Sequence, residues 1–184
     1  MKYVALLRGI NVGKSVQVPM KTLKGLFEGL GFTNVLTYLN SGNVVFESLL
    51  DGPEASRMIE DELGKTFGQR IPTLVRTASE MIEIERSLPR EWKNDDKEQT
   101  YVAYLFDDAA GPEIIEELPV RKEYMNIFYA NKAIIWNIKR ENYNRSRITK
   151  IVGHESYRRM TTRNVNTARK LSELCGGSAS DRGP

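Results

Sequence analysis

The chain has 184 residues, of which 40% are hydrophobic and 28% are charged, a balance typical of a globular protein that buries a core; its net charge of +3 identifies no partner. No apolar run approaches the roughly 18 residues of a membrane span, and the apolar start is too short for a signal peptide, so we expect no membrane association. A single cysteine and a single histidine exclude a disulfide framework, a cysteine-rich zinc site and a multi-histidine centre, so we expect a cytoplasmic protein without a metal or cofactor.

The first 88 residues predict a β-α-β-β-α-β order of elements. Helices are expected to begin at Pro19 and Asp51, because apolar residues recur with helical spacing after each of them. Thr77 and Glu80 have the spacing of a capping box and predict a further short helix. Four short apolar stretches predict the strands: residues 3–7, 35–39, 44–46 and 73–76. This order is the ferredoxin-like, or split βαβ, arrangement.

The rest of the chain predicts a second, degenerate half. The polar residues 89–99 are expected to link a domain of residues 1–88 to one of residues 100–175. Strands are expected at 101–106, 124–129 and 133–138, and helices at 113–118, 142–152 and 164–175. The order β-α-β-β-α lacks a last strand and suggests duplication of one unit. The predicted class is therefore α+β with two ferredoxin-like halves and a C-terminal helix, followed by a disordered tail at 176–184.

Several predicted strands lack the alternation of a half-exposed strand. The runs VALL, VLTYL, VVF and IIW are apolar on both faces. Such strands are typical of a sheet that is buried on both sides. The second face would be covered by the other half of the chain or by another subunit, so a homo-oligomer is one of the expected assemblies.

Residues 8–15, RGINVGKS, match the phosphate-binding loop of nucleotide hydrolases only in part. That loop needs four residues between its glycines, and here three lie between Gly9 and Gly13. The helix that should open at the lysine is expected only at Pro19, so a nucleoside triphosphate site is not expected. Two interpretations stay open: backbone N–H groups beside Arg8 and Lys14 that bind a small anion, and a loop that needs glycine torsions.

Residues 40–43, NSGN, have the residue types of a tight hairpin turn, because Asn and Gly tolerate positive φ. The predicted topology gives no reason to place this turn and the loop 8–18 at one edge of the sheet, so the sequence does not join them into one site. The strand after the turn has Phe46 as its only aromatic residue and lacks the stacking platform of an RNA-recognition motif.

Charge is distributed unevenly along the chain. Residues 93–138 carry 5 basic and 9 acidic side chains, whereas residues 139–184 carry 11 basic and 4 acidic ones. The basic segment can attract anions to one part of the molecule, or it can bind the acidic segment beside it. Nucleic acid is among the anions that such a segment can contact through its backbone.

Residues 161–167, TTRNVNT, precede the last predicted helix. Thr162 is expected to be its N-cap, with Arg163 and Asn164 in the first turn. An arginine at that end opposes the helix dipole, and a bound anion would explain it. Together with Arg158 and Arg159, the segment is therefore an expected phosphate or carboxylate contact, or else a salt-bridge partner of the acidic residues 93–138.

Other reactive residue types predict ordinary roles. His154 has no companion histidine and is expected on the surface, and Ser156 lacks a nucleophile-elbow setting. Cys175 lies on an apolar helix face and is expected in the core. Asp107 and Asp108 would suit magnesium, but they also suit a turn, and no further acidic residue is available in the hairpin, so a magnesium site is rejected.

Three segments together closely resemble family 1697 of the bacterial domains of unknown function: LLRGINVGKS, GFTNVLTYLNSGNVVF and MTTRNVNTARKL. The resemblance extends from Tyr3 to about Leu174 and implies a duplicated α/β fold with ferredoxin-like halves. The family pattern has a second glycine in place of Lys14 and a lysine in place of Ser15, so the resemblance does not mark Lys14 as a shared functional residue. It implies an architecture and no reaction.

Three functional hypotheses follow. The first, which we favour, is a binding protein for a phosphorylated or other anionic ligand or for nucleic acid. The second is a small hydrolase or transferase whose polar groups hold an oxyanion; its catalytic residues are unknown because no general base is apparent. The third is a homo-oligomeric scaffold. The residues expected to bind the ligand are Arg8, Asn11, Asn43, Thr162, Arg163 and Asn164.

Overall fold

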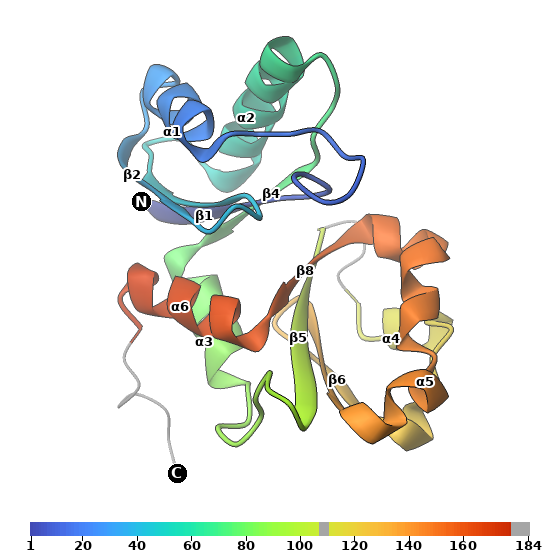
Figure 1. Cartoon of the computed structure of the whole chain (residues 1–184). Coiled ribbons are helices and arrows are strands. Elements are labelled where there is room, and N and C mark those ends of the chain that lie inside the picture. The colour runs from blue at the N-terminus through green and yellow to red at the C-terminus, as the bar shows by residue number, and fades with distance from the viewer. Residues whose placement is uncertain (107–110, 178–184) are drawn as a thin grey trace. The chain divides into compact units, whose positions relative to one another are not determined.

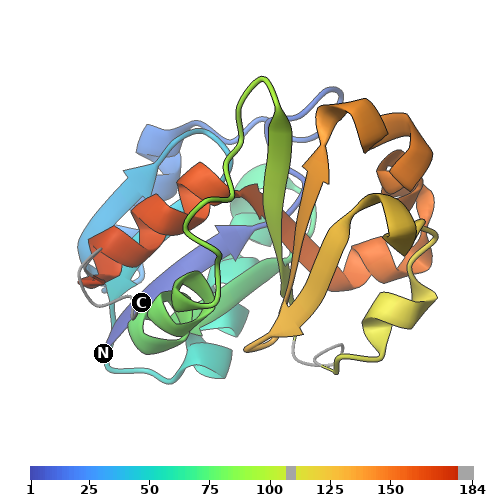
Figure 2. The same cartoon turned by 90° about the horizontal axis from the view of Figure 1, so that it is seen from below.

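The structure, a computed structural model, describes residues 1–106 and 111–177. Its contacts divide this part of the chain into two compact units, one made of Met1–Met81 with residues 174–177 and the other of Ile82–Glu173. Each unit contains a four-stranded antiparallel sheet with helices, which confirms the predicted α+β class with two ferredoxin-like halves. Figures 1 and 2 show the elements of each unit in two views.

The first unit has the predicted order of elements. Its strands are β1 (Lys2–Leu7), β2 (Thr33–Tyr38), β3 (Asn43–Glu47) and β4 (Thr73–Thr77), and its helices are α1 (Met20–Gly29) and α2 (Gly52–Phe67). The strand order across the sheet is β2-β3-β1-β4, so β1 lies at the centre. Both helices lie against the same face of the sheet (Figure 1).

The first three helices begin where the sequence predicts them. Pro19 directly precedes α1, and Asp51 precedes α2 and accepts a hydrogen bond from the backbone N of Glu54 at 2.8 Å. Helix α3 (Ala78–Arg86) begins with the predicted capping box. There the Thr77 backbone N donates to Oε2 of Glu80 at 2.8 Å, and the Glu80 N donates to Oγ1 of Thr77 at 3.2 Å. Each cap satisfies backbone donors that the helix itself leaves without a partner.

Strand β1 is buried on both faces, as its unbroken apolar run predicts. Tyr3, Ala5 and Leu7 belong to the core beneath the two helices. Val4 and Leu6 point to the opposite face and are also buried. Because successive side chains of a strand alternate between faces, this central strand has no polar side.

The turn between β2 and β3 packs against the end of β1. The two strands β1 and β3 are antiparallel, with Leu6 opposite Asn43, and the backbone N of Leu7 donates to the Gly42 oxygen at 2.8 Å. Gly42 has a φ of +76°, and a Cβ added there would lie 2.7 Å from Cβ of Leu7 and 2.8 Å from Cδ1 of Ile10. A larger residue at this position would therefore strain the backbone and also clash with the core.

The second unit repeats the strand order of the first. Its strands are β5 (Glu98–Leu105), β6 (Asn126–Ala130), β7 (Ala133–Lys139) and β8 (Met160–Asn164), in the order β6-β7-β5-β8. Strand β5 is thus central, as β1 is in the first unit. Helices α4 (Ile114–Glu117) and α5 (Tyr143–Ser146) are short, and α6 (Val165–Cys175) follows β8. The shared strand order is what duplication of one unit would produce, and the duplication itself stays a prediction.

Two predictions for the second unit are wrong. The sequence predicts no last strand, but β8 pairs with β5 along its length. Its sequence, MTTRN, has no apolar run, so only its hydrogen bonds to a central strand identify it as a strand. The single helix predicted at 142–152 is interrupted at Arg147, which has a left-handed φ of 57°, and continues as a 3-10 helix at Ile148–Gly153. A second 3-10 helix follows at Glu155–Arg159.

Strand β5 extends into the polar segment 89–99, which was expected to be a linker, because the strand begins at Glu98. Asp95, in the same segment, accepts hydrogen bonds from the backbone N of Lys97 and of Glu98, and these bonds lower the pKa of its carboxyl.

Asp107, Asp108 and residues 178–184 of the predicted tail lie outside the described residues. None of the described helices combines the length and the apolar character needed to cross a bilayer.

We expect Gly42→Ala to lower the free energy of unfolding by more than Gly68→Ala. Both glycines have positive φ, but an added Cβ meets nothing within 4 Å at Gly68. Both variants carry a left-handed backbone cost of about 1–2 kcal/mol, and Gly42→Ala adds an overpacking cost of about 1–3 kcal/mol. Urea unfolding followed by circular dichroism measures the difference. Equal losses in the two variants would contradict the tight packing of the turn.

Candidate functional site

Asn11 holds the loop at residues 8–18 against the turn that precedes β3. Its Nδ2 donates to the backbone oxygens of Asn40 at 2.7 Å and Val18 at 2.9 Å, and its Oδ1 accepts from the Val18 N at 2.7 Å. The structure therefore joins the two segments at one edge of the sheet, whereas the sequence did not connect them. The reason is the antiparallel pairing of β1 with β3, which brings the end of one strand to the start of the other.

The other two predicted residues of the first unit lie at the same edge. Asn43 is buried, and its Nδ2 donates to the Tyr38 oxygen and to Oγ of Ser41, both at 2.9 Å. Arg8 is half-buried, and its backbone N donates to the Pro72 oxygen at 2.9 Å. Arg8, Asn11 and Asn43 are thus brought together, but the two asparagine amides bond to the protein's own backbone.

The glycine loop closes on itself. The Val12 N donates to Oγ of Ser15 at 2.8 Å, and the Ser15 N donates to the Val12 oxygen at 2.9 Å. Helix α1 begins only at Met20. The lysine and serine of this loop therefore open no helix, and the loop lacks the helix N-terminus with which nucleotide hydrolases bind phosphates.

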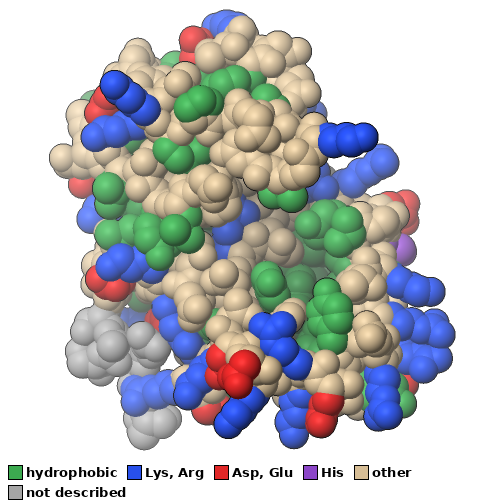
Figure 3. Space-filling view, viewed as in Figure 1, with side chains coloured by type: hydrophobic (Ala, Val, Ile, Leu, Met, Phe, Trp, Pro, Cys, Tyr) green, Lys and Arg blue, Asp and Glu red, His purple; other side chains and the backbone are tan. Residues whose placement is uncertain are grey.

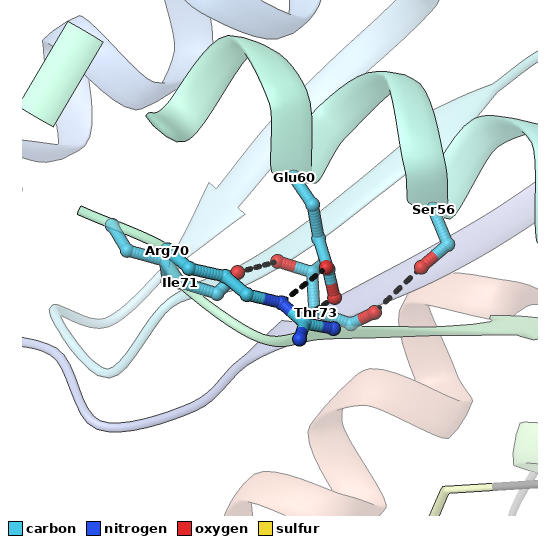
Figure 4. Close-up of polar contacts among 5 residues, drawn as sticks. All are labelled: Ser56, Glu60, Arg70, Ile71 and Thr73. Atoms are coloured by element: carbon cyan, nitrogen blue, oxygen red, sulfur yellow. Dashed lines mark hydrogen bonds and ion pairs between the residues drawn. The ribbon is translucent and has the colours of Figure 1, made fainter. Parts of the chain in front are cut away.

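A polar network fixes β4 at this edge, as Figure 4 shows. Glu60 of α2 accepts from the Thr73 backbone N at 2.9 Å and from Nε of Arg70 at 3.1 Å. Ser56, one turn earlier, donates to the Thr73 oxygen at 2.7 Å. Thr73 lies opposite Leu7 in the sheet. The carboxylate of Glu60 is therefore engaged in holding a strand start, and its role is structural.

In the second unit, Thr162 and Arg163 are neighbours in β8. Because side chains alternate along a strand, the two point to opposite faces of the sheet. Arg163 is buried, and its Nη1 donates to Oγ1 of Thr161 at 2.9 Å and to the Thr162 oxygen at 2.8 Å. Burial lowers the pKa of its guanidinium to about 10, so it stays charged at neutral pH. The prediction that these residues begin a helix is wrong, since both belong to a strand.

Asn164 is the residue that caps α6, the role predicted for Thr162. Its Oδ1 accepts from the backbone N of Thr167 at 2.9 Å, the bond expected of an N-cap residue. The three neighbouring residues Thr162, Arg163 and Asn164 therefore have separate roles: a partly exposed sheet position, a buried sheet position and a helix cap.

A pocket of about 190 Å³ opens on the Thr162 side of this sheet. Aromatic rings make up much of its lining. Tyr101 of β5 and Trp136 of β7 are cross-strand partners whose ring centroids lie 6.1 Å apart at an interplanar angle of 26°. The short helical turns after β7 supply Tyr143 and Tyr157. The full lining is Gln99, Tyr101, Trp136, Tyr143, Ile148, Thr149, Ile151, Val152, Tyr157 and Thr162.

These aromatic residues were not among those expected to bind a ligand. The only strand judged for base stacking was the one that carries Phe46, in the first half of the chain. A signal was available, because Tyr143 and Tyr157 lie within the most basic segment of the chain. Aromatic residues interleaved with cations are typical of surfaces that bind single-stranded nucleic acid.

Exposed cations lie on the same short turns that line the pocket. Arg145, Arg147, Lys150 and Arg158 are all exposed, and none of them has an ion pair with another described residue. Arg159 differs, because its Nη1 lies 3.2 Å from Oε2 of Glu117. Figure 3 shows blue cationic side chains gathered around apolar ones on this part of the second unit. The site therefore combines an apolar, ring-lined pocket with an uncompensated positive rim.

Ser156 and His154 do not form a catalytic pair. Ser156 is buried, and its Oγ donates to Oε2 of Glu117 at 3.0 Å. The imidazole Nδ1 of His154 accepts instead from the Ser156 backbone N at 3.3 Å. A Ser–His pair needs the serine hydroxyl bonded to the imidazole, and here the hydroxyl bonds to a carboxylate instead. Within residues 1–106 and 111–177, no group of three His, Cys, Asp or Glu side chains could hold a metal ion.

Comparisons with known proteins identify an architecture. A family model described as a protein of unknown function (DUF1697) matches residues 1–136. No curated protein matches the chain. Among solved structures, the conserved bacterial protein SP0830 from Streptococcus pneumoniae is similar with a TM-score of 0.79 and 24% sequence identity, over 95% of this chain and 98% of that chain. At this identity the similarity shows the fold alone.

We expect Asn164→Ala to lower the free energy of unfolding by about 1 kcal/mol, because it removes the side-chain acceptor at the start of α6. Asn166→Ala is the matched control, since Asn166 is exposed in the first turn of the same helix. Its replacement should change stability by less than about 0.5 kcal/mol. Thermal or urea unfolding gives both values, and equal effects would refute the cap assignment.

Proposed function

The chain belongs to the DUF1697 family of proteins of unknown function, and we propose that it is a binding protein for phosphorylated or other anionic ligands, nucleic acid included. The observation that carries this proposal is the positive rim of the second unit. Arg145, Arg147, Lys150 and Arg158 lie on the short turns that supply lining residues of the pocket, and they have no ion pair with an acidic side chain among the described residues.

Uncompensated cations on short turns favour an anionic ligand on physical grounds. Residues 139–159 carry seven basic and two acidic side chains, so like charges repel one another until an anion binds. The rim cations lie at the protein surface, where the phosphates of a ligand can reach them. Binding through such contacts should weaken as salt concentration rises, because bound phosphates release counterions.

Of the six residues expected to bind the ligand, Thr162 is one that lines the pocket. A binding role stays a prediction for all six: Arg8, Asn11, Asn43, Thr162, Arg163 and Asn164. The amides of Asn11 and Asn43 bond to the protein's own backbone, as does the side chain of Asn164. We place the rest of the site on the aromatic residues and cations around Thr162.

The alternative of a hydrolase or transferase has less support. The buried Ser156 donates its hydroxyl hydrogen bond to Glu117, and the buried Cys175 has its thiol pKa raised by burial to about 11, which disfavours the reactive thiolate. The chain has a single cysteine, which fits a reducing compartment, and we therefore expect the protein to act in the cytoplasm.

Loss of two rim cations should weaken anion binding and lower its salt dependence. We expect the double variant Arg145→Gln/Lys150→Gln to bind a fluorescein-labelled single-stranded oligonucleotide more weakly than the wild type. The slope of log affinity against log salt concentration should fall by about 1.4, because each lost phosphate contact with a single strand removes about 0.7. Fluorescence anisotropy at several salt concentrations measures both.

The matched control is Lys21→Gln/Arg57→Gln, which removes two exposed cations from the first unit and leaves the net charge equal to that of the rim variant. This control should bind like the wild type. An equal loss in both double variants would mean that net charge, and no particular site, attracts the oligonucleotide. Failure of the wild type to bind any phosphorylated probe at low salt would refute the proposed function.

A further inference from the structure

The ring-lined pocket has a shape and a chemistry that the positive rim alone does not explain. A bare anion such as phosphate needs N–H donors and cations, but this pocket is lined mostly by apolar and aromatic atoms. Tyr101 and Trp136 form one wall on the sheet, and Tyr143 and Tyr157 extend from the turns above it. Flat aromatic walls favour a flat aromatic ligand, because stacked rings exclude water from both faces.

We infer that this pocket takes a single nucleobase, so that the ligand held by the rim is a nucleotide, either free or at an unpaired position of a nucleic-acid strand. The inference rests on the proposed function and names the ligand of the same site. A base stacked on aromatic side chains with its phosphate against cations is the general mode of single-strand binding.

The size of the pocket matches one ring system. Its volume is about 190 Å³, below the roughly 300–1,000 Å³ typical of pockets for drug-sized ligands. A dinucleotide or an extended cofactor would not fit inside. The pocket therefore accommodates one base and leaves the sugar and phosphate outside, on the side where Arg147 and Lys150 lie next to the lining residues Ile148, Thr149 and Ile151.

Two polar side chains in the lining can read the edge of a base. The amide of Gln99 and the hydroxyl of Thr162 have no hydrogen bond to another described residue. An amide offers both donors and an acceptor, and a hydroxyl offers one donor and two acceptor sites. Base edges present the complementary donors and acceptors, so Gln99 and Thr162 can form hydrogen bonds with a base. A plain hydrocarbon ring has no such groups and could not form these bonds.

Trp136 allows binding in the pocket to be observed directly. The chain has two tryptophans, and the other one, Trp92, contacts Phe128 and is not among the pocket residues. The variant Trp92→Phe keeps a ring at that contact and leaves Trp136 as the only indole. Trp136 is largely buried, with 5% of its surface exposed, so a bound base would contact only the part of the indole that lines the pocket. We expect a nucleoside 5′-monophosphate to quench the fluorescence of this variant through that contact.

Ribose 5-phosphate and a matched pair of oligonucleotides separate the contributions of base and phosphate. Ribose 5-phosphate carries the sugar and phosphate without a base and should neither quench Trp136 nor compete with the nucleotide at equal concentration. A short single-stranded oligonucleotide should bind at least about ten-fold more tightly than an abasic strand of the same length, since stacking of one base is worth about that factor. Comparison of the intact strand with the mononucleotide then identifies whether the base comes from a strand or a free nucleotide.

Tyr143→Ala tests the pocket without removing a core residue, because Tyr143 is only half-buried. Binding of the intact oligonucleotide should fall about ten-fold, and binding of the abasic strand should not change. Tyr124→Ala is the matched control, a half-buried tyrosine of the same unit outside the pocket, and should leave both affinities unchanged. Thr162→Val, which keeps the side-chain shape, should alter the preference among the four bases without changing abasic binding.

The possible failures of the two proposals can be told apart. Equal affinity of the intact and abasic strands, with no quenching of Trp136, would overturn the base pocket and leave anion binding at the rim intact. Absence of binding for every phosphorylated probe would overturn the proposed function as well. Quenching that survives in Tyr143→Ala with unchanged affinity would also overturn the assignment of the base to this pocket.

Discussion

Each unit depends on one constraint: its first strand must be hydrogen-bonded on both sides by strands that come later in the chain. Strand β1 lies between β3 and β4, and β5 lies between β7 and β8. The backbone groups of such a central strand bond to its two neighbours and not to water. When both faces of the sheet are covered, the side chains on both faces must also tolerate burial. In β1, Val4 and Leu6 on one face are as buried as Tyr3 and Leu7 on the other. The remaining elements are arranged around these pairings.

The same pairings decide which distant residues become neighbours. In the first unit they bring the end of β1 beside the start of β3, and Asn11, Gly42 and Asn43 consequently form one edge that is held by the protein's own hydrogen bonds. In the second unit they place Tyr101 opposite Trp136 and supply Thr162 from β8 on the other side of β5. The first edge uses its polar groups internally, whereas in the second unit partly buried rings such as Tyr143 line a pocket and cations on the same turns are exposed.

The two parts of the pocket differ in their relation to the family. The match to DUF1697 covers residues 1–136, which include Tyr101 and Trp136 on the sheet. The turns that carry Tyr143, Tyr157 and the rim cations lie beyond it. The similarity to SP0830 covers 95% of this chain, however, so the fold that the two proteins share includes most of these turns as well as the sheet.

Sequence alone was enough for features governed by local chemistry: the starts of α1 and α2, the capping box of α3 and the apolar strands β1 and β3 each follow from residues close together in the chain. Tertiary structure alone decided the rest. Strand β8 has no apolar pattern and exists because β5 offers it hydrogen-bonding partners, and this pairing moves Arg163 from an expected helix start to a buried strand position. The ring-lined pocket likewise depends on tertiary structure, because it joins Tyr101, Trp136 and Tyr157 across three separate elements. Strand pairing between distant segments leaves no periodic trace in the sequence, and for that reason the site emerged only once the sheets were assembled.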